Sequence, residues 1–401
     1  MGVLEGLAPD PEETPAPGLS FRAGPVVAIS AGHAVHDTYM GFLPILLPRF
    51  VERFALSNTK AGALSAFTQL PSLLQPVFGH LADRLALRWM VALFPGVTAT
   101  LMSLTGWAPT YAVLALLLTA AGASSAAFHA VASATAGRLS ARHLGRGLSV
   151  WMVGGELGSA LGPILAAGAL GLLTLKGLAW LMVLGWAASF VLHLQLRRLP
   201  TALAGTERPP WRRALGHMRR TMGIVTALAV LRAMALSAPW TFGPILLQEE
   251  GRSGLASGAA LTLYLAAGMA GTLGAGWLSD RLGRRVILLA GTLAGPGSLL
   301  LFIAVSGWSR FIFLAVSGAA TVALHPVCMA LVQEKFPESR GLANALYLST
   351  VFVVSSAAAV AVGALGDAIG LRTAFVISGA VTFLGIPLIF LLPRDGRVAL
   401  G

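Results

Sequence analysis

The sequence is poor in charge and in cysteine. Charged residues make up only 11% of the 401 residues, whereas a soluble globular protein carries about 25%, so the composition excludes an ordinary soluble enzyme. Cys328 is the only cysteine, which excludes an internal disulfide. Hydrophobic residues reach 56%, and the net charge of +12 is spread between apolar runs. This pattern argues against a nucleic-acid partner and predicts an all-α integral membrane protein with the lipid bilayer as its surroundings.

Several chemical signatures are also missing. The sequence has no nucleotide-binding loop, no histidine or cysteine cluster at zinc spacing and no nucleophile–base motif. We therefore expect no enzymatic activity, no cofactor and no bound metal. Residues 1–20 are rich in proline and acidic side chains, which is typical of a disordered tail. They lack the basic segment and cleavage site of a signal peptide, so the first apolar run is expected to be retained.

Long apolar runs dominate the remaining chain. A membrane-spanning helix needs about 20 apolar residues, and breaks rich in polar residues, glycine or proline separate the runs. The sequence predicts twelve spans with short connections, at 24–47, 60–81, 89–107, 111–137, 146–170, 174–196, 221–247, 256–279, 285–306, 311–334, 342–364 and 373–392.

Arginine and lysine predict the orientation of these spans. With both termini in the cytoplasm, twenty basic residues fall on the inner side and seven on the outer side. Cytoplasmic loops of membrane proteins carry such an excess. We therefore expect both termini to be cytoplasmic, in a bacterial inner membrane.

The two halves of the chain repeat each other. GFLPILL at 41–47 matches TFGPILL at 241–247, and GHLADR at 79–84 matches GWLSDR at 276–281. Parallel six-helix repeats are the plan of a large class of secondary transporters. The sequence thus predicts twelve transmembrane helices in two pseudo-symmetric six-helix bundles. The expected divisions are a disordered cytoplasmic tail (1–20), an N-terminal bundle (21–196), a cytoplasmic linker (197–220), a C-terminal bundle (221–393) and a second tail (394–401).

Three charged residues lie within the predicted spans, away from their ends. A charge at the bilayer centre costs about 2.5–3.5 kcal/mol on insertion scales, so Asp37, Glu156 and Arg232 each need a role. Helical spacing places Asp37 on one face with His33 and His36. A carboxylate beside imidazoles can exchange protons, which makes Asp37, His33 and His36 candidates for proton coupling. The alternative is a structural hydrogen-bond network between helices.

The remaining polar candidates are expected to line a substrate cavity. Arg232 either binds an anionic group of the substrate through its guanidinium or neutralises Asp37 or Glu156. His129 and His325 occupy equivalent positions in the two halves, and Tyr39 and Trp240 complete the predicted cavity.

Glu156 belongs to the segment GGELGSALGP at 154–163. Gly154, Gly158 and Gly162 recur every fourth residue, and such a stripe lets helix backbones approach closely. Packing is the role we expect for the glycines. Glu156 is a candidate for gating or proton relay, or it belongs to the same packing surface.

Two motifs resemble those of the major facilitator superfamily. Gly276, Asp280, Arg281, Arg284 and Arg285 follow the loop signature of that superfamily. The first-half copy keeps Gly79, Asp83 and Arg84 but has Ala86 and Leu87 at the later positions. The resemblance implies that these loops stabilise one state of the transport cycle. Gly158, Gly162 and Pro163 are similar to the fifth-helix motif of the antiporters in this superfamily, which implies export.

A narrower resemblance covers about 30–170 and, more thinly, the second half. GHAVHDTYMGFLPILLP (32–48), LPSLLQPVFGHLADR (70–84) and GASSAAFH (122–129) resemble the fosmidomycin resistance transporters, a bacterial family of drug:proton antiporters. The resemblance implies that His33, Asp37 and His129 lie in the polar cavity.

These observations together predict a secondary active transporter. It would export a small drug-like or anionic organic compound in exchange for protons, by alternating access, and would act as a monomer. The alternative is proton-linked uptake of a small organic acid, with Arg232 binding the carboxylate.

Overall fold

The computed structural model describes residues 22–78, 88–140, 144–197, 211–336 and 340–392. Helices account for nearly all of this part, and it contains no strand. Ten of the described helical segments are long and apolar enough to cross a membrane. The two other predicted spans, 24–47 and 60–81, form interrupted helices, and the second of them runs into residues outside the description. The architecture is two six-helix halves, as predicted.

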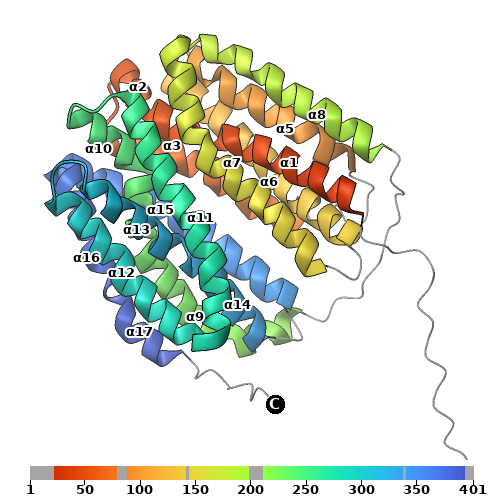
Figure 1. Cartoon of the computed structure of the whole chain (residues 1–401), viewed down its shortest axis with the longest axis vertical. Helices are drawn as coiled ribbons and strands as arrows, with labels where there is room; N and C mark the ends of the chain where they lie inside the picture. Colours follow the sequence, from red (N-terminus) through yellow and green to blue (C-terminus); the bar gives the residue numbers. More distant parts are fainter. Residues whose placement is uncertain (1–21, 79–87, 141–143, 198–210, 337–339, 393–401) are drawn as a thin grey trace, which may run out of the picture.

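The two halves lie side by side in Figure 1. The first half comprises α1 (Ala23–Met40), α2 (Leu43–Phe54), α3 (Asn58–Gln69), η1 (Leu70–Leu74), α5 (Arg88–Ser103), η2 (Leu104–Trp107), α6 (Tyr111–Ser140), α7 (Leu144–Leu172), η4 (Gly177–Leu181) and α8 (Met182–Leu196). The second half comprises α9 (Trp211–Ser237), η5 (Ala238–Phe242), α10 (Gly243–Glu249), α11 (Gly254–Leu282), α12 (Arg284–Ala304), α13 (Arg310–Val322), α14 (Leu324–Lys335), α15 (Arg340–Ile369), α16 (Leu371–Thr382) and α17 (Gly385–Leu391).

The repeated GFLPILL and TFGPILL segments interrupt their helices at equivalent places. In the first half, α1 ends at Met40 and α2 begins at Leu43, with Pro44 in its first turn. In the second half a π-helical segment, η5, separates α9 from α10, which carries Pro244 in its first turn. Proline has no N–H to donate to the preceding turn, so helices bend or loosen there.

Two predicted boundaries differ most from the structure. The first span was expected to end at residue 47, but helix α2 continues to Phe54 because Phe50 is buried and Arg53 donates to the Gly106 carbonyl at 2.8 Å. The linker was expected to extend to residue 220, but α9 begins at Trp211. Apolar length reports the part of a helix inside the membrane and misses polar turns beyond it. The division into domains remains a prediction.

Glycine residues allow α1 and α7 to pack closely. A Cβ on Gly158 would lie 2.9 Å from the Ala34 Cα, and one on Gly162 would lie 2.6 Å from the Thr38 carbonyl oxygen. Gly154 faces the Ser30 backbone in the same way. The stripe at 154–162 therefore lies directly against α1, as close helix packing in membranes requires.

The halves contact each other mainly through α3 with α15 and α7 with α11. A Cβ on Gly62 would lie 2.8 Å from the Ala359 carbonyl carbon, and one on Gly258 would lie 2.9 Å from the Pro163 carbonyl oxygen. The Asp367 carboxylate on α15 accepts bonds from the Asn58 and Thr59 backbone N–H groups, at 2.6 and 2.9 Å. We call this region, where the start of α3 meets the end of α15, the closed end.

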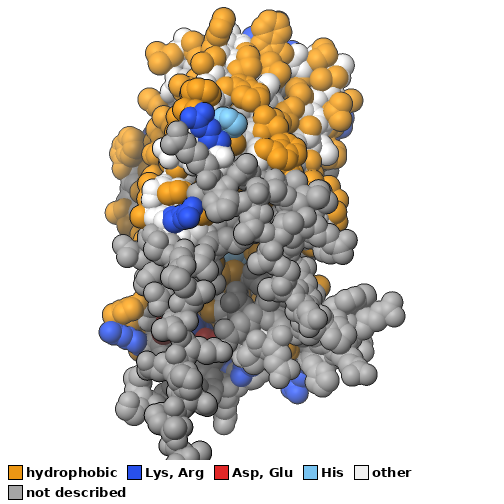
Figure 2. Space-filling view, turned by 90° about the vertical axis from the view of Figure 1, so that its right-hand side faces the viewer, with side chains coloured by type: hydrophobic (Ala, Val, Ile, Leu, Met, Phe, Trp, Pro, Cys, Tyr) orange, Lys and Arg blue, Asp and Glu red, His pale blue; other side chains and the backbone are white. Residues whose placement is uncertain are grey.

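The outer surface is strongly apolar. Large hydrophobic side chains are exposed on several helices, among them Leu172, Trp180, Phe190 and Leu384. Hydrophobic side chains cover the described upper part of the face in Figure 2, interrupted by a few basic residues and one histidine. Such a surface suits contact with lipid tails rather than with water.

Candidate functional site

A cavity of about 280 Å³ lies between the two halves. Its first-half wall comes from α1, α2, α3, η1, α6 and α7, and its second-half wall from α9, η5 and α15. The lining contains both polar and apolar side chains. It consists of Asp37, Met40, Gly41, Leu43, Pro44, Ser65, Thr68, Gln69, Ser72, Ser125, His129, Ser159, Leu236, Ser237, Trp240, Thr241, Phe352 and Ser355. We call this space the central cavity.

Asp37 anchors a cluster of three histidines at the wall of this cavity. Its carboxylate lies 2.8 Å from His36 Nδ1, 3.2 Å from His33 Nε2 and 3.5 Å from His129 Nε2. The His33 and His129 Nε2 atoms are themselves 3.0 Å apart. Asp37, His33 and His36 come from α1 and His129 from α6, so the fold joins two helices through one group of titratable side chains.

Backbone carbonyls determine the protonation of two of these rings. His33 Nδ1 lies 2.9 Å from the Trp151 carbonyl oxygen, and His129 Nδ1 lies 2.9 Å from the Ser125 carbonyl oxygen. A carbonyl oxygen only accepts hydrogen bonds, so both Nδ1 atoms carry a proton. The contact between the two Nε2 atoms then becomes a hydrogen bond only when one ring holds a second proton. One additional proton would therefore join the two rings through this contact.

Aromatic rings keep the histidines in place. The Trp151 ring stacks on His33 with centroids 4.2 Å apart, and the Phe128 ring stacks on His36 at 4.5 Å. His36 is fully buried, and its Nε2 atom has no hydrogen-bond partner. A buried nitrogen without a hydrogen-bond partner is unfavourable. In the described part of the chain, His36 Nε2 is such an atom within the cluster.

The ligand atoms of His33, Asp37 and His129 all lie within 4.8 Å of one another. A single small cation could sit among them, but a proton is enough to join atoms that are already at hydrogen-bond distance. The expectation that the chain binds no metal therefore remains a prediction.

The other predicted residues are divided between the cavity and the helix interiors. Trp240 lines the central cavity with Asp37 and His129. The Tyr39 hydroxyl instead donates to the Leu181 carbonyl oxygen at 2.5 Å, and its side chain is buried. Glu156 is half-buried on α7 and makes no hydrogen bond or ion pair within the described part of the chain.

Arg232 and His325 lie inside the second half and are absent from the lining of the central cavity. Arg232 donates from Nη1 to the Thr321 carbonyl oxygen at 3.0 Å. The Tyr347 hydroxyl lies 3.2 Å from His325 Nδ1, and the two rings are stacked with centroids 5.3 Å apart. Arg232 pairs with neither Asp37 nor Glu156, so the counter-ion interpretation of this arginine does not match the geometry.

Sequence reasoning missed the polar wall on α3 and η1. Ser65, Thr68, Gln69 and Ser72 face the central cavity, and their spacing of three and four residues is that of one helix face. This stripe could have been found in the sequence, since the surrounding residues are apolar. The tenth span (311–334) was expected to line the cavity, but α3 and α15 contribute instead.

The second-half loop motif forms a compact ionic group. Arg284 Nη2 lies 2.6 Å from Asp280 Oδ1 and 2.6 Å from Glu334 Oε1, so it joins α11, α12 and α14. Arg281 lies over the Trp277 ring at 3.8 Å. Gly283 turns the chain between α11 and α12 with φ of 93°, a conformation that favours glycine.

The other loop residues are less informative. Arg285 Nη2 donates to the Phe390 carbonyl oxygen at 3.2 Å, and a Cβ on Gly276 would meet no atom within 4 Å. The first-half copy, with Gly79, Asp83 and Arg84, lies outside the described residues.

Comparison with known proteins agrees with this architecture. The chain is 25% identical over 375 residues to the fosmidomycin resistance protein of Escherichia coli (strain K12), covering 91% of each chain. It is also 25% identical over 390 residues to the MFS-type transporter YfnC of Bacillus subtilis (strain 168), covering 93% of each.

Solved structures show the same fold. A bacterial homolog of the human lysosomal transporter Spinster, in an inward-facing and occupied conformation, matches with a TM-score of 0.79 and 14% identity over 93% of this chain and 97% of that one. A D-xylose-proton symporter matches with a TM-score of 0.74 and 14% identity over 94% and 99%.

The family model covers almost the whole chain. The model described as Major Facilitator Superfamily matches residues 29–259 and 225–400, and the predicted resemblance to this superfamily is confirmed. Its members move small molecules across membranes and are not enzymes. This chain is therefore a multi-pass membrane transporter that belongs to the Major Facilitator Superfamily.

Proposed function

We propose that this transporter exports a small drug-like or anionic organic compound in exchange for protons. The observation that carries the proposal is the contact of one carboxylate, Asp37, with three imidazoles at the wall of the central cavity. The similarity to the fosmidomycin resistance protein supports export of a drug-like compound. In this proposal the chain works as a monomer in the bacterial inner membrane, with both termini in the cytoplasm.

Proton binding at the cluster would change the charge of the cavity wall. Asp37 and His129 both face the cavity, so a proton gained or lost there changes the electrostatic energy of any substrate beside them. A substrate that binds better to the proton-free cluster would exchange for protons, because each would displace the other. This competition is the physical basis of antiport.

The same cluster supports one alternative. An imidazolium at the cavity wall attracts a negatively charged group, so an anionic substrate that prefers the protonated cluster would bind together with a proton. Such a transporter would take up a small organic acid with its protons. The two candidates predict opposite directions of proton movement relative to the substrate.

Alternating access would come from rocking the two halves about the central cavity. In the predicted orientation the closed end faces the outside of the cell. The contacts between α3 and α15 at the closed end, together with those between α7 and α11, would then separate to release substrate outward. The Arg284 group would hold α11, α12 and α14 together during this movement.

Proteoliposomes with an internal pH dye test the proposal. Fosmidomycin, a panel of amphipathic drugs and small organic acids would be added in turn under an imposed pH gradient. We expect substrate-dependent proton movement opposite to the substrate, and its loss in Asp37→Asn. Glu52→Gln is the matched control, since Glu52 is an exposed acid whose carboxylate contacts only Arg49 at 3.5 Å.

Three results would contradict the proposal. Unchanged proton movement in Asp37→Asn would remove the coupling role of the cluster. Movement of protons in the same direction as the substrate would replace export by uptake. Substrate transport without any proton movement would show that another gradient, or none, drives the transporter.

A further inference from the structure

Among the described residues, no acid neutralises the charge of Arg232, a buried arginine in the second half. Arg232 is 7% exposed, and its Nη1 group donates to one backbone carbonyl, that of Thr321. Within the described residues no carboxylate forms an ion pair with it. Buried charges in proteins are paired or bound to ions, because an isolated charge in an apolar interior is very costly.

A second buried arginine in the same half shows what full pairing looks like. Arg310 is 5% exposed, contacts the Glu250 carboxylate through two nitrogens, and donates from Nε to the Phe302 carbonyl oxygen at 3.1 Å. Each of the three nitrogens of that guanidinium therefore has an acceptor in the protein. Arg232 has the same burial but lacks the acid.

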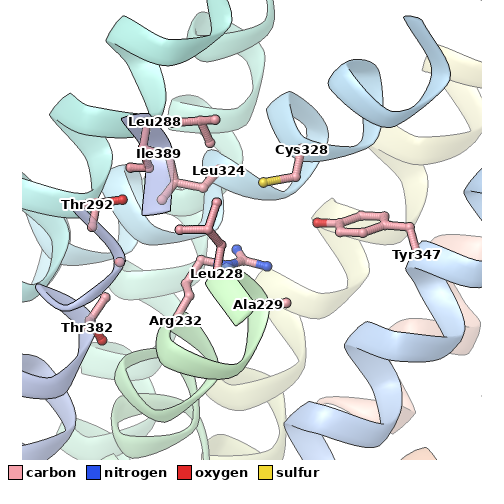
Figure 3. A pocket seen from close by; sticks show the side chains of 11 residues that line it. Leu228, Ala229, Arg232, Leu288, Thr292, Leu324, Cys328, Tyr347, Thr382 and Ile389 are labelled. Carbon is pink, nitrogen blue, oxygen red and sulfur yellow. The ribbon is translucent and has the colours of Figure 1, made fainter. Parts of the chain in front are cut away.

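Arg232 points into a small cavity that is separate from the central cavity. Figure 3 shows its guanidinium directed toward the Cys328 thiol and the Tyr347 hydroxyl. Leucine, isoleucine and threonine side chains from α9, α12, α14, α16 and α17 close the remaining walls. The cavity measures about 20 Å³ and shares no lining residue with the central cavity.

The size of this cavity limits what can occupy it. About 10–15 Å³ is needed to hold one water, so the space admits a single particle of roughly that size. An organic carboxylate or phosphonate is larger than this space and would not fit unless the packed side chains moved apart. Water alone would fit but would leave the charge of Arg232 without compensation.

We propose that the Arg232 cavity binds one small monovalent inorganic anion of the chloride class. The anion would accept hydrogen bonds from those N–H groups of the Arg232 guanidinium that have no acceptor among the described residues. The Tyr347 hydroxyl and the Cys328 thiol line the same cavity. It would neutralise the arginine within the second half and hold α9, α14 and α15 together. The site is distinct from the cavity in which the proposed substrate binds.

Direct binding of radioactive chloride to the purified protein tests this site. Protein prepared in sodium gluconate would be titrated with labelled chloride at constant ionic strength. We expect one ion per chain and a loss of affinity of about tenfold or more in Arg232→Gln, since a hydrogen bond to a charged group is worth about 1.5–3 kcal/mol. Thermal unfolding in chloride and in gluconate would be recorded in parallel, and chloride should raise the midpoint.

Matched variants separate the site from general salt effects. Arg372→Gln removes an exposed arginine of the same half and should keep full chloride binding. Arg232→Lys retains the positive charge and should keep part of the chloride binding. It replaces Arg232→Gln as the test variant if Arg232→Gln folds poorly. Gel filtration of each variant shows whether it is intact.

Several outcomes would overturn the proposal. The proposal is wrong if the wild-type protein binds no chloride, or if Arg232→Gln binds chloride as tightly as the wild type does. Displacement of chloride by methylphosphonate or acetate, with direct binding of these compounds, would instead make Arg232 part of the substrate site. None of these results depends on proton coupling, so the chloride site and the proposed function can fail independently.

Discussion

The two halves share a helix plan but differ in how they hold charge. In the first half, Asp37 and three histidines form one connected group that faces the central cavity. In the second half, Arg232 and His325 lie inside the bundle, and Arg232 lines a cavity too small for an organic molecule. Repetition of the backbone therefore does not repeat the chemistry. In the proposed function the first half carries the exchangeable proton, whereas the second half carries a buried positive charge.

The equivalent histidines His129 and His325 offer the sharpest test of this difference. His129→Gln should reduce substrate-dependent proton movement about tenfold to a hundredfold, because it removes a charge-assisted contact with Asp37. His325→Gln should reduce it less than about threefold, since this ring contacts the neutral Tyr347 hydroxyl. Both would be measured in the proteoliposome assay. Equal losses in the two variants would mean that the halves contribute alike.

Helix packing can be compared in the same way within α7. Gly158→Ala should destabilise the protein by about 1–3 kcal/mol, because the new Cβ would meet the Ala34 backbone, which cannot yield as a side chain would. Gly168→Ala is the control on the same helix, where a Cβ meets nothing within 4 Å. Thermal unfolding in detergent checks both. A Gly158→Ala protein as stable as Gly168→Ala would show that α1 and α7 are less closely packed.

A double-mutant cycle measures how strongly the cluster is connected. His33→Gln and His129→Gln should show a coupling of about 1 kcal/mol in unfolding free energy, since their Nε2 atoms lie 3.0 Å apart and would share one proton in the proposed function. His325→Gln and Tyr347→Phe in the second half should couple by about half as much. Additive effects for the first pair would indicate that the two rings do not share a proton.

The smallest expected effect concerns the contact between the halves. Asp367→Asn should weaken the closed end by about 1 kcal/mol or less, because the carboxylate is exposed although it accepts bonds from the first turn of α3. Spin labels at residues 52 and 369, in a Cys328→Ser background, would report the separation of the halves. A distance distribution identical to that of the unsubstituted protein would exclude this carboxylate from holding the closed end.

The sequence was most informative where length and periodicity decide the outcome. Twelve spans follow from apolar length, and the match of GFLPILL with TFGPILL predicted that the two halves repeat each other. The helix interruptions near residues 41 and 241 were found only in the structure. Asp37 was recognisable because a charge in an apolar run is costly wherever the helix packs. The end of α2 and the start of α9 were missed, since the polar turns beyond the membrane have no apolar signal.

The site was predictable one helix at a time. His33, His36 and Asp37 share one face of α1 by spacing alone, whereas the contact with His129 needs α1 and α6 to meet. Arg232 illustrates the limit. Its charge within a span suggested a substrate or an acid as partner. Only the direction of the side chain in the structure shows that Arg232 pairs with neither Asp37 nor Glu156.

The sequence by itself determined the membrane environment, the helix plan and the small set of intramembrane charges. These properties depend on the cost of placing each residue in lipid, which is local to its segment. The tertiary structure alone decided which charges meet, because that depends on distances between helices far apart in the chain. It brought three imidazoles to Asp37 at the central cavity and placed Arg232 in a separate cavity, where no acid from the described residues pairs with it.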